Sequence, residues 1–235
     1  MRGRKKGAGL TCAPDRLPSI RIPFFLKAWS YVEPVSLRRS PSDVSGRLEL
    51  RLYHNRFQLR TESARYSDGD RYFPAVAVVE HLQGCLPAVA RVLLLGGGLG
   101  SLIQVMRARG YHPCCTFVEK DEAVLGWALE ILGASPKLEP VCQDAESFMA
   151  TNHRKFDLVF VDVFRHRRVP DFVTAPAFLR QCRDGISTEG RLALNYIVEE
   201  EQRWQAAQAA FAAVFPAHHL ISARDSRILI SLPPG

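Results

Sequence analysis

The chain has 235 residues, of which 47% are hydrophobic and 23% are charged, as in an ordinary globular protein with a large core. The formal net charge is +7, but four positive charges lie within residues 1–6, so the rest of the chain carries only +3 (7 less 4). No apolar run reaches the roughly 20 residues that span a bilayer, and no apolar segment follows the basic N-terminus, which excludes a membrane partner and a secretory signal.

The six cysteines form no Cys-x-x-Cys pair, and the seven histidines form no His-Glu-x-x-His helix. Thiols without such spacing are typical of reduced cysteines in a cytoplasmic protein. We therefore expect a cytoplasmic location and no metal site.

The first part of the chain is expected to be a flexible basic leader, residues 1–18. A basic tail can bind nucleic acid or simply be solvated, and the solvated alternative is the commoner, so nucleic acid is not an expected partner. The aromatic-rich residues 20–37 are expected to pack as irregular structure or short strands, and the polar residues 38–46 to form a turn-rich link.

Residues 19–70 as a whole are predicted to form an N-terminal β-hairpin region. Residues 47–53 and 57–60 alternate apolar and polar side chains on either side of a turn, as the two strands of a hairpin do. A two-strand ribbon is marginally stable alone, and together with the aromatic stretch it favours a homodimer.

Residues 71–235 are predicted to form a doubly wound α/β domain, because short apolar strands alternate with amphipathic helical segments. Only four residues join the last two strands, which forces them antiparallel and predicts a mostly parallel, seven-stranded sheet with an antiparallel end. The expected strands are 92–95, 116–118, 138–142, 158–161, 191–196, 218–222 and 227–232, and the expected helices are 72–86, 99–109, 121–132, 145–151, 176–184 and one around 204–214.

The strongest local motif runs from an apolar strand into four glycines, Gly96, Gly97, Gly98 and Gly100. Glycines there allow a sharp turn and a close approach of the backbone to a ligand, and the following helix offers free N–H groups. A plain tight turn is the alternative, so the motif needs support from elsewhere.

Three carboxylates at the ends of successive strands provide that support. Glu119 can accept hydrogen bonds from both ribose hydroxyls of a nucleoside. Asp144 can accept from an adenine amino group, cap the helix that follows, or do both. Asp162 can take a proton from an attacking amine or hydroxyl, whereas Asp157 precedes its strand and is expected to be structural.

In this order the motifs resemble those of the spermidine-synthase-like branch of the class I S-adenosylmethionine-dependent methyltransferase fold. The resemblance implies that Gly96–Gly100, Glu119 and Asp144-Ala145 hold S-adenosylmethionine or its decarboxylated form, and that Asp162 is the base. It also implies substrate contacts from Tyr66, Asp70, Tyr72 and Arg165. It covers about residues 45–232, including 66–70, 96–100, 118–121, 143–145, 156–162, 178–179 and 190–195.

The chain departs from that family where a polyamine would bind. The family's motif Gly-Gly-Gly-Asp-Gly contains an acid where this chain has Leu99. The second acid of its motif Asp-x-x-Asp-Pro is replaced here by Arg165. The family's Tyr-Gln-Glu is replaced by Tyr72-Phe73-Pro74. Residues 165–168 read Arg-His-Arg-Arg, which would repel a polycation and favours an anionic acceptor; a solvated loop whose charges point away from the site is the alternative.

Three functions are compatible with these residues. The first is a transferase that moves a methyl or aminopropyl group to a small-molecule acceptor, and the second is a non-catalytic scaffold or nucleoside-binding protein that retains the fold. The third is a nicotinamide-dependent enzyme, which the antiparallel final strands disfavour.

Overall fold

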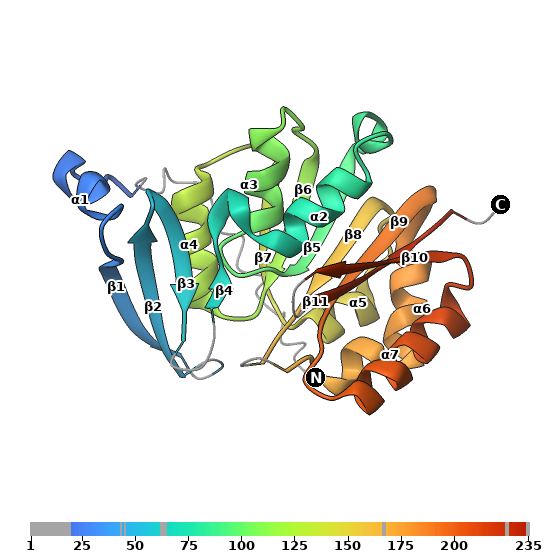
Figure 1. The fold of residues 1–235 in the computed structure, drawn as a ribbon. Helices are drawn as coiled ribbons and strands as arrows, with labels where there is room; N and C mark the ends of the chain where they lie inside the picture. The colour runs from blue at the N-terminus through green and yellow to red at the C-terminus, as the bar shows by residue number, and fades with distance from the viewer. Residues whose placement is uncertain are drawn as a thin grey trace, which may run out of the picture.

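The computed structural model describes residues 20–42, 44, 46–61, 65–165, 168–223 and 226–233, without the side chains at 65, 66 and 223. The predicted leader, residues 1–18, lies outside this part. The described residues form two sheets, a four-stranded sheet in the order β1-β2-β3-β4 and a seven-stranded sheet in the order β10-β11-β9-β8-β5-β6-β7 (Figure 1).

The small sheet contains the predicted hairpin, formed by β2 (Gly46–Tyr53) and β3 (Arg56–Arg60), which pair antiparallel. His54 and Asn55 connect them with φ values of 49° and 56°, the left-handed backbone that a two-residue hairpin turn requires. A short strand, β4 (Arg65–Ser67), adds to the other side of β3.

Two predictions for the first part of the chain were wrong. Residues 24–29 form a short helix, α1 (Phe24–Trp29), rather than irregular structure or strands. The expected link at residues 38–46 is mostly strand, because β1 (Val35–Ser42) pairs antiparallel with β2. β1 is an edge strand, where polar residues and Pro41 are tolerated, and this is why its sequence resembles a loop.

The large sheet has the predicted architecture. The strands β8 (Phe156–Asp162), β5 (Arg91–Gly96), β6 (Cys114–Glu119) and β7 (Leu138–Cys142) are parallel neighbours, and β9 (Ile186–Ile197) lies parallel to β8. β11 (Ser226–Ser231) runs antiparallel between β9 and β10 (His218–Ala223), as the short final connection predicts.

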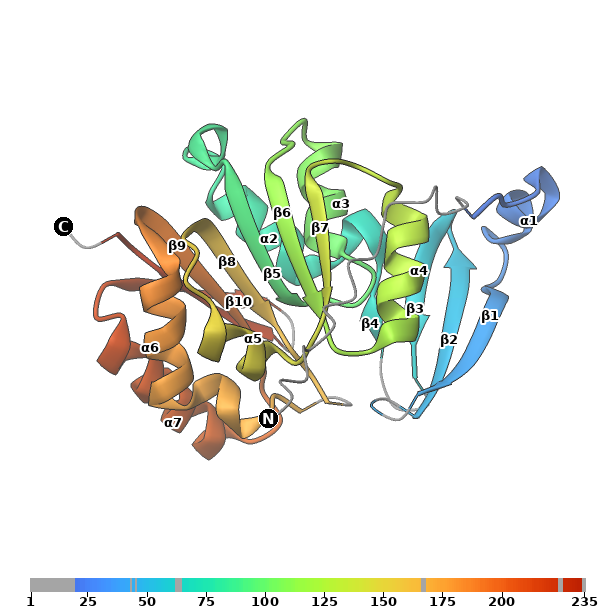
Figure 2. The ribbon, with the colours of Figure 1, turned by 180° about the vertical axis from the view of Figure 1, so that it is seen from behind.

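Helices cover both faces of this sheet (Figures 1 and 2). One face packs against α2 (Phe73–His81), α3 (Ser101–Ala108) and α4 (Glu122–Leu132), and the other against α5 (Ala145–Thr151), α6 (Pro176–Gly185) and α7 (Glu201–Val214). Successive residues of a central strand enter opposite cores, so all of them are apolar. Three short 3₁₀ helices complete the described chain, at Gly69–Arg71, Leu86–Ala88 and Asp171–Thr174.

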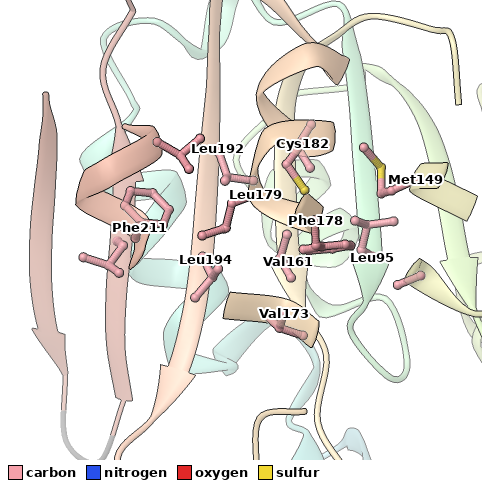
Figure 3. Packing of buried hydrophobic residues seen from close by; sticks show 14 of the residues in the cluster. Leu95, Met149, Val161, Val173, Phe178, Leu179, Cys182, Leu192, Leu194 and Phe211 are labelled. Carbon is pink, nitrogen blue, oxygen red and sulfur yellow. The ribbon is translucent and has the colours of Figure 1, made fainter. Parts of the chain in front are cut away.

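Figure 3 shows the core on the face of α5, α6 and α7. Leu95 of β5 and Val161 of β8 meet Phe178 and Leu179 of α6, and all four side chains are almost fully buried. This core fixes the carboxyl ends of β5 and β8 side by side, and those two strand ends carry the glycine turn and Asp162.

A third core joins the small sheet to the large domain. Leu48, Leu50 and Leu59 of the hairpin pack against Val124 and Trp127 of α4, together with Leu99. The hairpin therefore finds its cover within the same chain. In the described part of the chain no helix is both long and apolar enough to cross a membrane.

Candidate functional site

The glycine turn follows β5 and needs glycine for conformational and steric reasons. The φ angles of Gly96, Gly97, Gly98 and Gly100 are 74°, 96°, 57° and 70°, a region that other residues rarely adopt. A Cβ atom on Gly96 would lie 2.6 Å from the carbonyl oxygen of Asp162. The Gly97 N–H donates to that same oxygen at 3.2 Å, so the turn is attached to the end of β8.

A cleft of about 560 Å³ opens at the carboxyl ends of the parallel strands, where ligands of open α/β sheets bind. This volume lies within the usual range of small-molecule sites. The predicted residues that line it are Gly96, Gly97, Gly98, Glu119, Asp144, Ala145, Asp162 and Arg165. Gly100 does not line the cleft, because it lies at the start of α3 against Leu132.

Glu119 ends β6 and faces the cleft. Burial raises the pKa of its carboxyl to about 7, although hydrogen bonds from the backbone N–H groups of Asp121, Lys120 and Gly98 oppose the shift. The nearby charge of Asp121 raises the pKa further. A partly desolvated acceptor at this position fits a donor pair such as two ribose hydroxyls.

Asp144 performs the predicted capping role. Its Oδ1 accepts from the N–H groups of Glu146 and Ser147 at 3.0 and 3.4 Å and so caps α5. Its Oδ2 lies 3.1 Å from Nζ of Lys120 at the mouth of the cleft. Because Oδ1 caps the helix and Oδ2 pairs with Lys120, an adenine amino group would have to share Oδ2 or use the adjoining backbone, and the adenine role stays a prediction.

Asp162 ends β8 and is 4% exposed. Its Oδ1 accepts from the Tyr72 hydroxyl at 3.1 Å and from Nδ2 of Asn195 at 2.8 Å. Burial raises the pKa of Asp162 to about 6, and the two hydrogen bonds limit that rise. Both donors meet the same oxygen, which fixes the plane of the carboxyl and leaves Oδ2 without a donor from these two residues.

Of the predicted substrate residues, the structure places some at the cleft and others away from it. Tyr72 joins Asp162 directly, and Arg165 is exposed at the cleft on a tight turn closed by two backbone hydrogen bonds with Arg168, of 2.8 and 3.1 Å. Asp70 instead pairs with Arg56 of β3 at 2.7 Å on the surface and does not line the cleft. The side chain of Tyr66, and His166 and Arg167 of the basic turn, lie outside the described residues.

Leu99, at the position of the family's acid, is fully buried among Leu48, Leu59 and Trp127. It packs beneath the N-terminal sheet and does not line the cleft. The replacement of the acid is therefore accompanied by an apolar environment in which a carboxylate would be unfavourable.

Sequence reasoning assigned no role to several residues that the fold brings to the site. Asn195 lies on β9, two residues before the strand ends, with its Nδ2 2.8 Å from Oδ1 of Asp162, and Lys120 pairs with Asp144. Leu48 and Leu59 of the small sheet, with Val44 from the connection between β1 and β2, form an apolar wall of the cleft. An asparagine near the end of a strand, beside a strand that ends in aspartate, is the one local signal that could have indicated Asn195.

The lining fits a nucleoside in chemistry as well as in volume. It combines an acceptor for hydroxyl groups at Glu119, a glycine turn without side chains that a ligand can approach closely, and an apolar wall. Among the described residues there is no cluster of three or more side chains that could hold a metal ion.

The order and direction of the strands are those of the class I methyltransferase fold. Comparison of the sequence with protein-family models and with curated proteins found no match. Comparison of the structure finds the fold of spermidine synthases and of S-adenosylmethionine-dependent methyltransferases.

The chain is similar to a probable spermidine synthase from Corynebacterium glutamicum, with 17% identity, 84% of this chain and 79% of that chain covered, and a TM-score of 0.69. It is also similar to spermidine synthase from Thermotoga maritima, with 16% identity, 85% of this chain and 73% of that chain covered, and a TM-score of 0.67. For human methyltransferase-like protein 13 in complex with SAH, the identity is 19%, 70% of this chain and 81% of that chain are covered, and the TM-score is 0.59. The resemblance to the spermidine-synthase-like fold that the motifs indicate is confirmed.

Proposed function

We propose that this chain is a transferase that binds S-adenosylmethionine or its decarboxylated form and moves a methyl or aminopropyl group to a small-molecule acceptor, with Asp162 as base. The observation that carries the proposal is the placement of Asp162, held by Tyr72 and Asn195 in the same cleft as the glycine turn and Glu119. The likeness to structures of spermidine synthases and of a methyltransferase in complex with SAH supports the same cofactor class.

The residues of the chain would divide the work between binding and proton transfer. Glu119 would hold the ribose, and the backbone groups around Gly97, Asp144 and Ala145 would hold the rest of the nucleoside. When bound, the cofactor supplies a sulfonium-activated carbon for in-line attack by the acceptor. Oδ2 of Asp162 would remove the proton that the attacking group loses, and much of the rate would come from positioning.

Transfer of the methyl group is the alternative that the site favours. The buried Leu99 offers no carboxylate to the amino group of a decarboxylated cofactor, and its surroundings are apolar. S-adenosylmethionine itself carries a carboxylate, and the N-terminal end of α3, which begins directly after the glycine turn, favours a negative charge. Aminopropyl transfer stays as the second candidate, because spermidine synthase structures cover 84% and 85% of the chain.

An anionic acceptor is proposed from the charges at the cleft. Arg165 is exposed on its lining, and Arg168 is exposed on the other arm of the same turn. At about 6–8 Å in a partly dry cleft, each fixed positive charge would oppose a polycation by about 2–3 kcal/mol at an effective dielectric constant near 20. The same charges would attract a carboxylate or phosphate group.

Calorimetric titration tests the cofactor. We expect micromolar binding of S-adenosylmethionine, weaker binding of the decarboxylated form, and loss of both in Glu119→Ala. Preference for the decarboxylated form would shift the proposal to aminopropyl transfer. If neither form nor methylthioadenosine binds, the cofactor proposal is wrong and the scaffold alternative leads.

Turnover tests the role of Asp162. With radiolabelled S-adenosylmethionine and a panel of anionic acceptors, we expect Asp162→Asn to keep cofactor binding and lose transfer. Arg165→Gln should raise the KM for the acceptor with little change in cofactor affinity. Transfer by Asp162→Asn at the parent rate would remove Asp162 from the mechanism.

A further inference from the structure

A second cavity, of about 210 Å³, lies at the amino ends of the parallel strands, on the opposite edge of the sheet from the cofactor cleft. Figure 2 shows the arrows of β5, β6, β7 and β8 running in the same direction, so the amino ends of these strands all lie at the same edge of the sheet. A ligand held at one edge cannot touch the other, and the second cavity is independent of the proposed transferase site.

Cations gather at this edge in a regular way. Arg91 begins β5, Lys137 directly precedes β7, and Lys155 directly precedes β8. Because β8, β5, β6 and β7 are successive neighbours, these three side chains are spread over about 14 Å, three strand spacings. All three line the cavity, together with Arg154.

The acids near the cavity leave a net positive charge. Glu139 is the acid in the lining, and Arg154 neutralises it at 2.6 Å while the Thr116 hydroxyl donates to it at 2.9 Å. Asp157 lies close enough for the charge of Arg91 to lower its pKa, but its oxygens are taken by backbone N–H groups and by Ser187. After both acids are counted, two of the four cations stay unbalanced.

Both lysines of the cavity are oriented without being neutralised. Nζ of Lys137 donates to the carbonyl oxygen of His112 at 2.9 Å, and Nζ of Lys155 donates to the carbonyl oxygen of Asp184 at 2.5 Å. Each ammonium group therefore has two further N–H donors available. Among the described residues, the Arg91 guanidinium has no hydrogen-bond or ion-pair partner, which leaves its five donors available.

We propose that this cavity binds a phosphate group. Several preoriented N–H donors and an uncompensated positive charge suit a compact anion with many acceptor oxygens, and phosphate has both properties. The volume is below the usual range for a whole drug-sized ligand, so a single phosphoryl group enters. That group is either free phosphate or the terminal phosphate of a nucleic-acid strand.

Titration with inorganic phosphate at constant ionic strength tests the proposal. We expect saturable binding, weakened about tenfold in Arg91→Gln and again in Lys137→Gln, the size of the loss of one charge-assisted hydrogen bond. Arg180→Gln, which removes an exposed charge on α6, is the matched control and should bind as the parent does. Thermal melts without phosphate identify any variant that fails to fold, and the remaining variant then decides.

Two results would overturn the proposal. Equal binding by the parent, Arg91→Gln and Lys137→Gln would show that the cavity holds no phosphate. Loss of binding in Arg165→Gln instead would place the phosphate in the cofactor cleft. Titration with a single-stranded oligonucleotide, with and without a 5′-phosphate, identifies the source of the phosphate. If the phosphorylated strand binds more tightly and Arg91→Gln abolishes that difference, the ligand is the end of a nucleic-acid strand. If only free phosphate binds, the ligand is a small anion.

Discussion

Replacing Asp162 by asparagine should stabilise the protein at neutral pH. Burial raises the pKa of this carboxyl from an ordinary value of 3.8 to about 6. The ionised side chain is therefore less favourable in the folded than in the unfolded chain by about 3 kcal/mol at pH 7.5. An asparagine keeps an oxygen for Tyr72 and Asn195 to donate to, and it carries no charge to desolvate.

The sign of the pH dependence follows from the raised pKa. The folded protein binds the Asp162 proton more tightly than the unfolded chain does, so this group favours folding below pH 3.8 and its contribution is lost as the pH rises through 6. The unfolding free energy of Asp162→Asn minus that of the parent should increase by about 2 kcal/mol between pH 4.5 and pH 7.5. Urea denaturation at the two pH values measures this difference.

Asp157→Asn is the matched control, because its pH dependence should have the opposite sign. Burial raises the pKa of Asp157, but hydrogen bonds from Arg91, Ser187 and Ala90 outweigh burial and lower it. Asp157 therefore stabilises the fold at neutral pH, and its asparagine variant should lose stability relative to the parent as the pH rises. If the stability difference between Asp162→Asn and the parent does not change with pH, the pKa of Asp162 is not raised by burial and the reasoning is refuted.

The other predictions concern the cofactor cleft. The pKa of Glu119 is raised to about 7, and in the proposed complex ribose hydroxyls would donate to its ionised form, so adenine-nucleoside affinity should weaken about tenfold for each unit below pH 7. Glu119→Gln should bind weakly and without this pH dependence in calorimetry, and an unchanged pH profile in that variant would contradict the assignment. Leu99→Asp should lower the unfolding free energy by about 3–5 kcal/mol in urea titration, because it places a carboxylate in a fully buried apolar cluster. A normal melting temperature, with tighter binding of decarboxylated S-adenosylmethionine, would instead mean that position 99 opens to the cleft.

The sequence was most informative where a single strand or helix suffices. The apolar run of β5 followed by Gly96 and Gly97 indicated a strand and a turn, because local backbone preferences alone require glycine there. A helix cap was one of the two roles predicted for Asp144, from its position before a helical segment, and the cap is present. The antiparallel end of the sheet followed from a connection too short for a crossover.

The sequence failed where a segment depends on distant partners. β1 resembles a polar loop, and only its pairing with β2 makes it a strand. The substrate role of Asp70 stays a prediction, and its ion pair with Arg56 of β3 was not visible in the motif. Neither outcome is encoded in the local periodicity of the segment itself.

The amino-acid sequence by itself determined the order of the main strands and helices within residues 71–235, the glycine turn and the three strand-end carboxylates, because these depend on burial periodicity and on backbone preferences of single residues. Only the tertiary structure decided that Asn195 and Tyr72 hold one oxygen of Asp162, that Leu99 is sealed beneath the small sheet, and that Arg91, Lys137 and Lys155 share an edge. Those contacts join residues tens of positions apart, and the register between strands, which no local pattern specifies, brings them together.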